Sequence, residues 1–185
     1  MTEPGRRERH KLTTRRALED SALRLFARDG YDETSVEAIA ADAGVSPRTF
    51  FRYFATKDEV LEMGREERQA DLRARIRELA ATDRSDFDVV RNAVVELARG
   101  FEADRVRLLL RARAAASSPL LRGRLHDTFH SWEYVVAREL GGDASARVLA
   151  AVGFSVFRAS MAIWLDEGGS LPELVEGGFA TIRPS

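Results

Sequence analysis

Cysteine is absent from the 185 residues of this chain, and lysine is nearly so. Without cysteine there is no disulfide framework, thiolate catalysis or cysteine-ligated zinc site. A cytoplasmic location is the default expectation. Lys11 and Lys57 are the only lysines, against 27 arginines. Because arginine is so common, a single arginine is informative only through its position.

An excess of charge of either sign is also missing. The 29 basic and 30 acidic side chains leave a formal charge of −1, which argues against a protein that coats polyanions by its overall field. No run of about 18 uncharged apolar residues exists, so we expect no membrane span. The basic N-terminus has no apolar segment after it and does not resemble a secretory signal.

Helical periodicity dominates the chain, and strand alternation is nearly absent. Leu18, Ala22, Leu25 and Phe26 form an apolar stripe on a helix that should end at Gly30. The pattern predicts an all-α fold of about nine helices. The later ones are expected at about 36 to 43, 47 to 53, 56 to 81, 87 to 101, 106 to 116, 119 to 140, 144 to 167 and from 171 on.

Helix start signals support these boundaries. Capping boxes stand at Thr34–Glu37 and Thr56–Glu59, and Ser46 is followed by proline at the first helical position. The second box predicts one long helix from Thr56 to about Ala81. We expect a three-helix N-terminal domain over residues 1–56 and a larger helical bundle over residues 57–185.

Residues 36–53 have the layout of a helix-turn-helix. Ile39 and Ala43 should face inward from the first helix, and Gly44 should supply the turn, where positive φ costs least. Arg48 could reach a guanine with its guanidinium fork, and Phe51 could contact thymine methyl groups. Residues 1–16 hold six basic and two acidic side chains, and we expect a mobile basic arm there.

Two short helices around a glycine turn also occur in proteins that never touch DNA. Phe50 and Phe54 are expected to be core, and Arg48 and Arg52 could be a solvated face. A helical small-molecule binding protein without a DNA role therefore stays open. An enzyme is disfavoured, because the chain has no glycine-rich phosphate loop, His-Glu metal motif or serine nucleophile elbow.

Several segments resemble the tetracycline-repressor family signature. They are Phe26–Tyr31, Thr34–Val36 with Ile39 and Ala40, Ala43–Ser46, and Thr49–Lys57. The resemblance covers about residues 12–60. It implies an all-helical homodimer that binds operator DNA through the helix-turn-helix. A small, largely apolar effector in the C-terminal bundle would release a repressor, although an activator is an alternative. No cofactor is implied.

The resemblance also assigns roles to residues. Base contacts fall on Pro47, Arg48 and Phe51. Phosphate contacts fall on Thr34, Ser35, Thr49, Arg52, Tyr53 and Lys57. At residue 51 tyrosine is usual in the family, so the phenylalanine lacks a hydroxyl there. The wording of residues 48–54 is similar to a subgroup of actinobacterial regulators, some of them linked to acyl-CoA sensing.

The helix expected at 143–167 is apolar all round, so we expect it to be buried on both sides. One face would meet the partner of a two-fold dimer, although a monomer enclosed by its own bundle fits the pattern too. Interface candidates are Leu149, Val152, Val156, Ile163, Leu174, Val175 and Phe179. Candidates for an apolar pocket, each also explained by core packing, are Phe101, Leu109, Arg113, Phe129, Trp132, Phe157, Arg158, Met161 and Trp164.

Two histidines four residues apart, His126 and His130, were weighed as metal ligands. A third ligand at suitable spacing is missing from the sequence. We therefore expect surface histidines and no metal.

Overall fold

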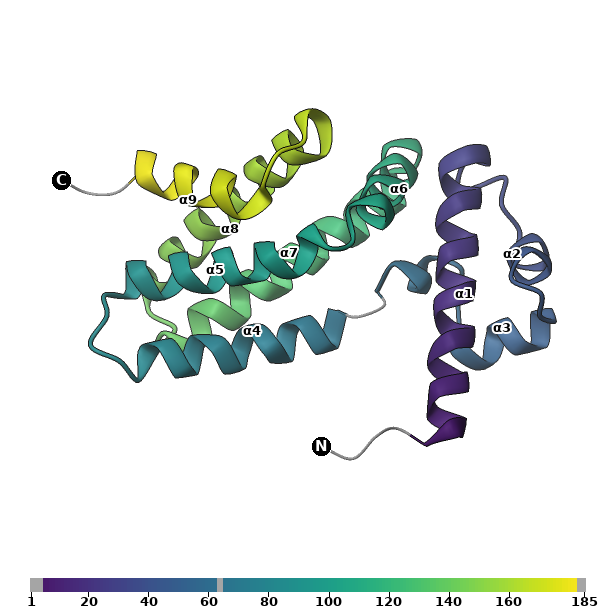
Figure 1. Ribbon diagram of the computed structural model, residues 1–185, viewed down its shortest axis with the longest axis horizontal. Coiled ribbons are helices and arrows are strands. Elements are labelled where there is room, and N and C mark those ends of the chain that lie inside the picture. The colour runs from purple at the N-terminus through teal and green to yellow at the C-terminus, as the bar shows by residue number, and fades with distance from the viewer. Residues whose placement is uncertain (1–4, 63–64, 183–185) are drawn as a thin grey trace. The chain divides into compact units, whose positions relative to one another are not determined.

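The computed structural model describes residues 5–62 and 65–182, and within these ranges the regular elements are all helices, joined by turns and short loops. The predicted all-α class is confirmed. The described residues form two compact units (Figure 1). The first holds residues 5–62 and 109–125, and the second holds residues 65–108 and 126–182. Residues 109–125 are the end of one helix and the start of the next, so this hairpin belongs to the first unit.

Nine α-helices and one short 3-10 helix make up the described residues. Their bounds are α1 Arg6–Asp29, α2 Val36–Asp42, α3 Pro47–Tyr53, η1 Asp58–Glu62, α4 Arg65–Ala80, α5 Asp86–Glu102, α6 Arg105–Ser117, α7 Pro119–Glu139, α8 Ala144–Glu167 and α9 Leu171–Thr181. Ser46, Ser85 and Asp143 each cap a helix by accepting a backbone N–H, as their positions predict.

The single long helix expected from Thr56 to Ala81 is wrong in its first part. Residues 58–62 form the 3-10 helix η1, and α4 begins only at Arg65. Val60 and Leu61 are buried in the core of the first unit. Because this pair is buried in that core, residues 58–62 form a separate 3-10 turn and not the start of α4. The capping signal at Thr56 did not indicate this break.

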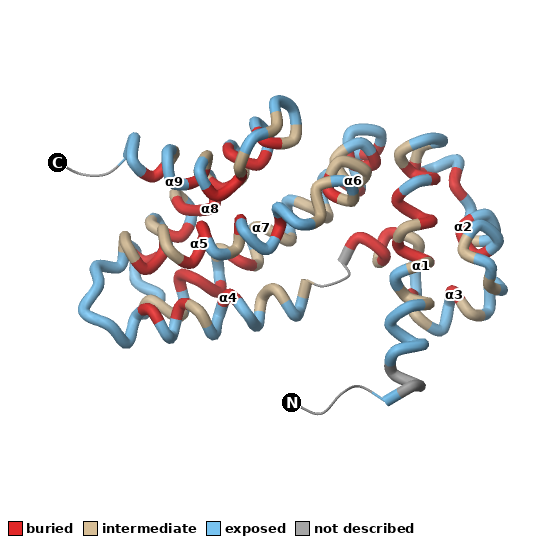
Figure 2. The backbone as a smooth tube through the Cα atoms, viewed as in Figure 1, coloured by how far each residue is buried: buried red, intermediate tan, exposed pale blue. Residues whose placement is uncertain are grey.

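The core of the first unit combines the three N-terminal helices with the α6–α7 hairpin. Its buried members are Leu18, Ala22, Leu23, Leu25, Phe26, Tyr31, Ile39, Ala40, Phe50, Phe54, Val60, Leu61, Ala114, Ala115 and Leu121. Figure 2 shows this burial on the later part of α1, while residues 9–13 are exposed. Since the hairpin supplies three of these side chains, the helix-turn-helix is completed by residues from far along the chain.

The second unit is a helical bundle in which α5, α8 and α9 pack against one another and α4 packs on α5. Its core is rich in aromatic residues, among them Phe154, Phe157 and Trp164 on one side of α8. By length and composition α8 could cross a membrane. Because these three aromatic side chains are buried in the bundle, α8 has the packing of a core helix.

Candidate DNA-binding site and ligand cavity

The helix-turn-helix has the geometry that its spacing predicts. Ile39 and Ala40 of α2 and Phe50 of α3 are fully buried. Gly44 has φ of 69°, and the amide of Val45 donates to the carbonyl of Ala40 at 2.9 Å. A side chain at residue 44 would strain this turn. The two helices are therefore held in a fixed relation.

The outer face of α3 carries the residues predicted to contact bases. Pro47, Arg48 and Arg52 are exposed, and Phe51 is 55% exposed although its ring packs edge-on against Phe50 at 5.5 Å. An exposed phenylalanine next to arginines is an unusual use of apolar surface. The aromatic ring suits the thymine methyl groups of a major groove, and the arginines suit its acceptor atoms.

Three of the residues predicted to contact phosphates, Thr49, Arg52 and Tyr53, lie on α3. The hydroxyls of Ser46 and Thr49 lie 3.0 Å apart, and the guanidinium of Arg52 lies over the ring of Tyr53, 5.2 Å from its centroid. Thr49 and Tyr53 are half-buried, with Arg52 exposed beside them. These three side chains form one polar border of the exposed α3 face.

Ser35 caps α2, one residue later than the predicted capping box. Its hydroxyl accepts the amide of Ala38 at 3.0 Å. Thr34 is 3% exposed. Its hydroxyl donates to the carbonyl of Gly30 at 2.7 Å, and its amide donates to Tyr31. Both donors of Thr34 are thus engaged inside the protein, whereas Ser35 is exposed.

Lys57 also makes internal contacts. Its Nζ donates to the carbonyl of Tyr31 at 2.6 Å and to that of Thr34 at 3.0 Å. It lies 4.1 Å from the centroid of the Tyr31 ring. The ammonium group therefore fixes the loop between α1 and α2, a positioning role that the sequence pattern did not separate from a phosphate contact.

A buried carboxylate extends this network to the α6–α7 hairpin. Asp58 accepts Arg124 at 2.5 Å and the hydroxyl of Tyr31 at 3.4 Å. Burial alone would raise the pKa of Asp58, but hydrogen bonds from Thr56, its own amide and Arg124 outweigh it and lower the pKa. Burial, and then the charge of Asp58, raise the pKa of Tyr31 to about 12. The loop that precedes Ser35 is held from two sides.

A second buried ion pair joins the hairpin to α1. Arg111 donates to Glu19, a carboxylate that is only 1% exposed. On α1 and α2, Asp42 accepts Ser21 at 2.7 Å and Arg24 at 2.6 Å. The hydrogen bond from Ser21 and then that from Arg24 lower the pKa of Asp42. Paired charges thus surround the small apolar core of the first unit.

The basic N-terminal segment differs from the expected mobile arm. Residues 6–16 form the first turns of α1, and the guanidinium of Arg15 lies over the ring of Phe54, 5.7 Å from its centroid. Residues 1–4 lie outside the described residues. Most of the basic charge of this segment is therefore carried on a helix.

The predicted pocket residues do not surround one cavity. Phe101, Trp132, Phe157, Met161 and Trp164 are buried core, with Phe129 packed against them. Leu109 and Arg113 fall in the other unit. Arg158 pairs with Glu133 of α7, so the charge that α8 carries inward finds a protein partner.

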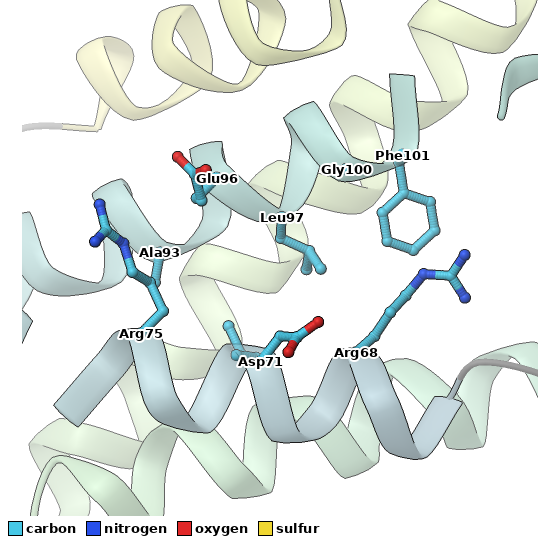
Figure 3. Close-up of a pocket in the computed structure, with 9 residues that line it drawn as sticks. Arg68, Asp71, Arg75, Ala93, Glu96, Leu97, Gly100 and Phe101 are labelled. Atoms are coloured by element: carbon cyan, nitrogen blue, oxygen red, sulfur yellow. The ribbon is translucent and has the colours of Figure 1, made fainter. Parts of the chain in front are cut away.

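A cavity of about 410 Å³ lies instead between α4 and α5 of the second unit (Figure 3). Its lining residues are Arg68, Asp71, Leu72, Arg75, Ala93, Glu96, Leu97, Gly100 and Phe101. Only Phe101 was a predicted pocket residue. In Figure 3 the side chains of Arg68 and Asp71 rise from α4 toward Phe101 and Leu97 of α5. Three of the four lining residues that α4 supplies are charged, so the sequence did not mark this face of α4 as a pocket.

His126 and His130 are exposed on α7, and their rings are stacked with centroids 6.4 Å apart. Among the described residues no group of three or more metal-ligating side chains occurs.

The segment that holds the helix-turn-helix is similar to known proteins. A model of bacterial regulatory proteins of the tetR family matches residues 18–63. The helix-turn-helix segment is 53% identical over 57 residues to the HTH-type transcriptional regulator TcmR of Streptomyces glaucescens. The segment that holds the helix-turn-helix is a DNA-binding domain of the TetR family. This alignment covers 31% of this chain and 25% of the length of TcmR.

Other TetR-family proteins match over most of their length. The chain is 27% identical over 190 residues to MftR of Mycobacterium tuberculosis, named as a mycofactocin biosynthesis transcriptional regulator, with 98% of this chain and 96% of MftR covered. It is also similar to the TetR-family repressor FadR of Thermus thermophilus, solved with lauroyl-CoA. That match has a TM-score of 0.59 and 25% identity, covering 92% of this chain and 97% of FadR. The matched proteins are transcriptional regulators.

The predicted dimer residues divide between surface and core. Leu149, Val152, Val156 and Leu174 are half-buried, and Ile163 is 43% exposed. Val175 and Phe179 instead lie fully inside their own bundle. These two face inward because α9 packs on both α5 and α8, which the sequence of α9 alone could not indicate.

Proposed function

We propose that this TetR-family regulator is a cytoplasmic, homodimeric repressor that binds a near-palindromic operator and leaves it when a small, largely apolar effector binds. The exposed face of α3 is the observation that supports DNA binding most directly. There Arg48 and Phe51 project from a helix that the Gly44 turn and the buried Phe50 hold in place. An arginine and an aromatic ring suit a guanine and a thymine methyl group.

In this proposal each residue is assigned a role according to whether its side chain is accessible to DNA or already bonded inside the protein. Pro47, Arg48 and Phe51 contact base edges. Ser35, Thr49, Arg52 and Tyr53 contact phosphates, because their hydroxyl or guanidinium groups lie at or near the surface. Thr34 and Lys57, whose donors are engaged in the α1–α2 loop, position that loop.

The dimer is proposed to form through the apolar surface that α8 and α9 leave exposed. Leu149, Val152, Val156, Ile163 and Leu174 lie at the surface or partly so. A two-fold interface of this kind presents two copies of α3, as reading two half-sites on successive major grooves requires.

The effector is proposed to bind in the second unit. The ligand of the similar FadR protein, lauroyl-CoA, has a long apolar part and supports an apolar effector here. Release of DNA requires an effector that binds the DNA-competent state more weakly than the other state. Helices α6 and α7 have residues in both units, so they are the continuous connection through which we propose the two sites are coupled.

DNA binding is tested by fluorescence anisotropy with the DNA upstream of the chain's own coding sequence and a scrambled duplex of equal length. We expect preference for the upstream DNA, and a footprint with two-fold symmetry. Arg48→Ala should weaken specific binding about 10- to 100-fold and relax the preference at one base position. Arg138→Ala, which removes an exposed arginine of α7, is the control with equal change of charge. No preference for any upstream segment, or equal behaviour of the two variants, would overturn the proposal.

A further inference from the structure

An indole N–H without a hydrogen-bond partner lies inside the second unit. Trp132 is 2% exposed, and among the described residues no acceptor lies within reach of its Nε1. The other tryptophan provides a contrast, because Nε1 of Trp164 donates to the carbonyl of Gly169 at 3.1 Å. Leaving a buried donor unpaired is unfavourable. The environment of Trp132 is therefore complete only when an oxygen atom approaches it.

Phe101 separates this indole from the α4–α5 cavity. It lines the cavity, and its ring centroid is 6.0 Å from that of Trp132 and 5.5 Å from that of Phe157. Phe101 stands in the last turn of α5, which ends at Glu102. Rotation of this one side chain would join the cavity to Trp132. A ligand ring in its place would restore the edge-to-face contacts that Phe101 gives up.

The charges of the cavity wall limit what can enter. The guanidinium of Arg68 lies 4.9 Å from the centroid of the Phe101 ring. Nε of Arg75 is buried and finds no acceptor among the described residues, although its Nη1 donates to Glu78 at 2.8 Å. Asp71 and Glu96 also line the cavity. Two arginines next to two carboxylates leave the cavity wall without net charge, which disfavours a polyphosphate. The buried Nε of Arg75, which has no acceptor among the described residues, is a donor for a single acid group.

We propose that the α4–α5 cavity is the effector site and takes a flat, largely apolar organic monoanion that carries a carbonyl oxygen. Its acid group binds Arg68 and Arg75, its ring system displaces Phe101, and its carbonyl oxygen accepts the N–H of Trp132. The cavity volume of about 410 Å³ is within the usual range for small-molecule sites. The inference rests on the proposed ligand-responsive function, but its test measures binding alone.

The test compares two flat carboxylates of nearly the same shape. Anthraquinone-2-carboxylate has ring carbonyls, and anthracene-2-carboxylate has none. Titration calorimetry on the full chain should show about tenfold tighter binding of the quinone, the value of one hydrogen bond to an otherwise unpaired donor. Trp132→Phe should abolish this ratio while both compounds still bind. Arg68→Gln should weaken both compounds several-fold and leave the ratio unchanged.

A spectroscopic measurement keeps the proposal testable if Trp132→Phe does not fold. With ¹⁵N-labelled tryptophan the wild-type chain gives two indole N–H signals, assigned with Trp164→Phe. The quinone should shift the Trp132 signal more than the anthracene compound does, because only the quinone accepts its proton. Equal shifts from both compounds, or a quinone preference that persists in Trp132→Phe, would overturn the role of Trp132.

Lauroyl-CoA is the third probe, because it carries several negative charges. We expect it to bind more weakly than the quinone, and tighter binding would overturn the monoanion assignment. The outcomes also separate the two proposals. A chain that binds its upstream DNA but neither carboxylate contradicts the effector site alone. A chain that binds the quinone but no DNA contradicts the proposed regulator and leaves the cavity assignment standing.

Discussion

In the first unit the side chains that we assign to DNA lie at or near the surface, whereas in the second unit the indole that we assign to the effector is buried. Arg48 and Phe51 project from α3, over an interior whose buried carboxylates Glu19 and Asp58 are paired with arginines. Trp132 lies among aromatic rings with its N–H unpaired. DNA, a rigid partner, contacts groups that are already held in place. A ligand enclosed in the second unit must instead supply the hydrogen-bond acceptor that the interior lacks.

From this contrast we expect the buried polar groups of the first unit to matter mainly for folding. We expect its exposed polar groups to matter mainly for contact with DNA. The buried pairs can be broken one at a time, and the surface groups can be matched to single atoms of the DNA. The following changes are ordered by the size of the expected effect.

Arg111→Met should have the largest effect, because it removes the guanidinium that pairs with the buried carboxylate of Glu19. We expect the free energy of unfolding to fall by about 3 kcal/mol, measured by urea denaturation followed by circular dichroism. Adding Glu19→Leu should restore most of the loss, since an apolar pair replaces the charges. A loss below about 1 kcal/mol, or a double variant as unstable as the single one, would show that this pair does not hold the hairpin.

Arg124→Met should destabilise the first unit by about 1–2 kcal/mol at neutral pH, less than Arg111→Met because Arg124 is more exposed. Loss of the hydrogen bond and the charge of Arg124 should raise the pKa of Asp58 relative to the wild type. In the wild type, the lowered pKa adds stability above the unfolded value of 3.8, and that stability is lost as the pH falls through the folded pKa. The stability difference between the two proteins should therefore vanish in acid.

Carboxyl ¹³C titration of both proteins measures this pKa change directly. Asp42 is the internal control, because its hydrogen bonds from Ser21 and Arg24 are intact in Arg124→Met and its pKa should stay low. An unchanged pKa of Asp58 would mean that Arg124 does not hold this carboxylate.

Phe51→Ala should weaken operator binding by roughly fivefold, about 1 kcal/mol for an apolar contact with a thymine methyl group. Replacing each operator thymine in turn by deoxyuridine removes one methyl group. One such replacement should weaken the wild type and leave Phe51→Ala unaffected. Anisotropy titrations measure both. If every replacement affects the two proteins equally, Phe51 does not read a methyl group.

Deleting residues 1–11 should have the smallest effect, a few-fold at moderate salt. The deletion removes four basic and two acidic side chains, and fewer counterions are then released on binding. The slope of log affinity against log salt should become shallower by about one or two. Circular dichroism would first confirm that α1 is retained. An unchanged slope would assign no phosphate contact to these residues.

The helix-turn-helix could be read from the sequence because its signals are local. Gly44 with the Ser46–Pro47 start fixed the turn and the beginning of α3, and the alternation of Phe50 with Phe51 separated core from surface. The N-cap at Ser35 and the 3-10 segment after Lys57 were missed because they depend on contacts with Tyr31 and the first-unit core. The pocket prediction was weaker for a similar reason, since large apolar residues on a helix look alike whether they fill a core or line a cavity.

The sequence by itself determined an all-helical chain, its TetR-like DNA-binding segment and the residues that face outward from α3. Periodicity and capping are properties of neighbours along the chain, so these features needed no tertiary information. Only the tertiary structure decided that residues 109–125 complete the first unit, that Lys57 holds a loop and that a cavity lies between α4 and α5. These features depend on which distant side chains meet and on which polar atoms stay unpaired. The lack of cysteine and of an excess of charge says nothing about either.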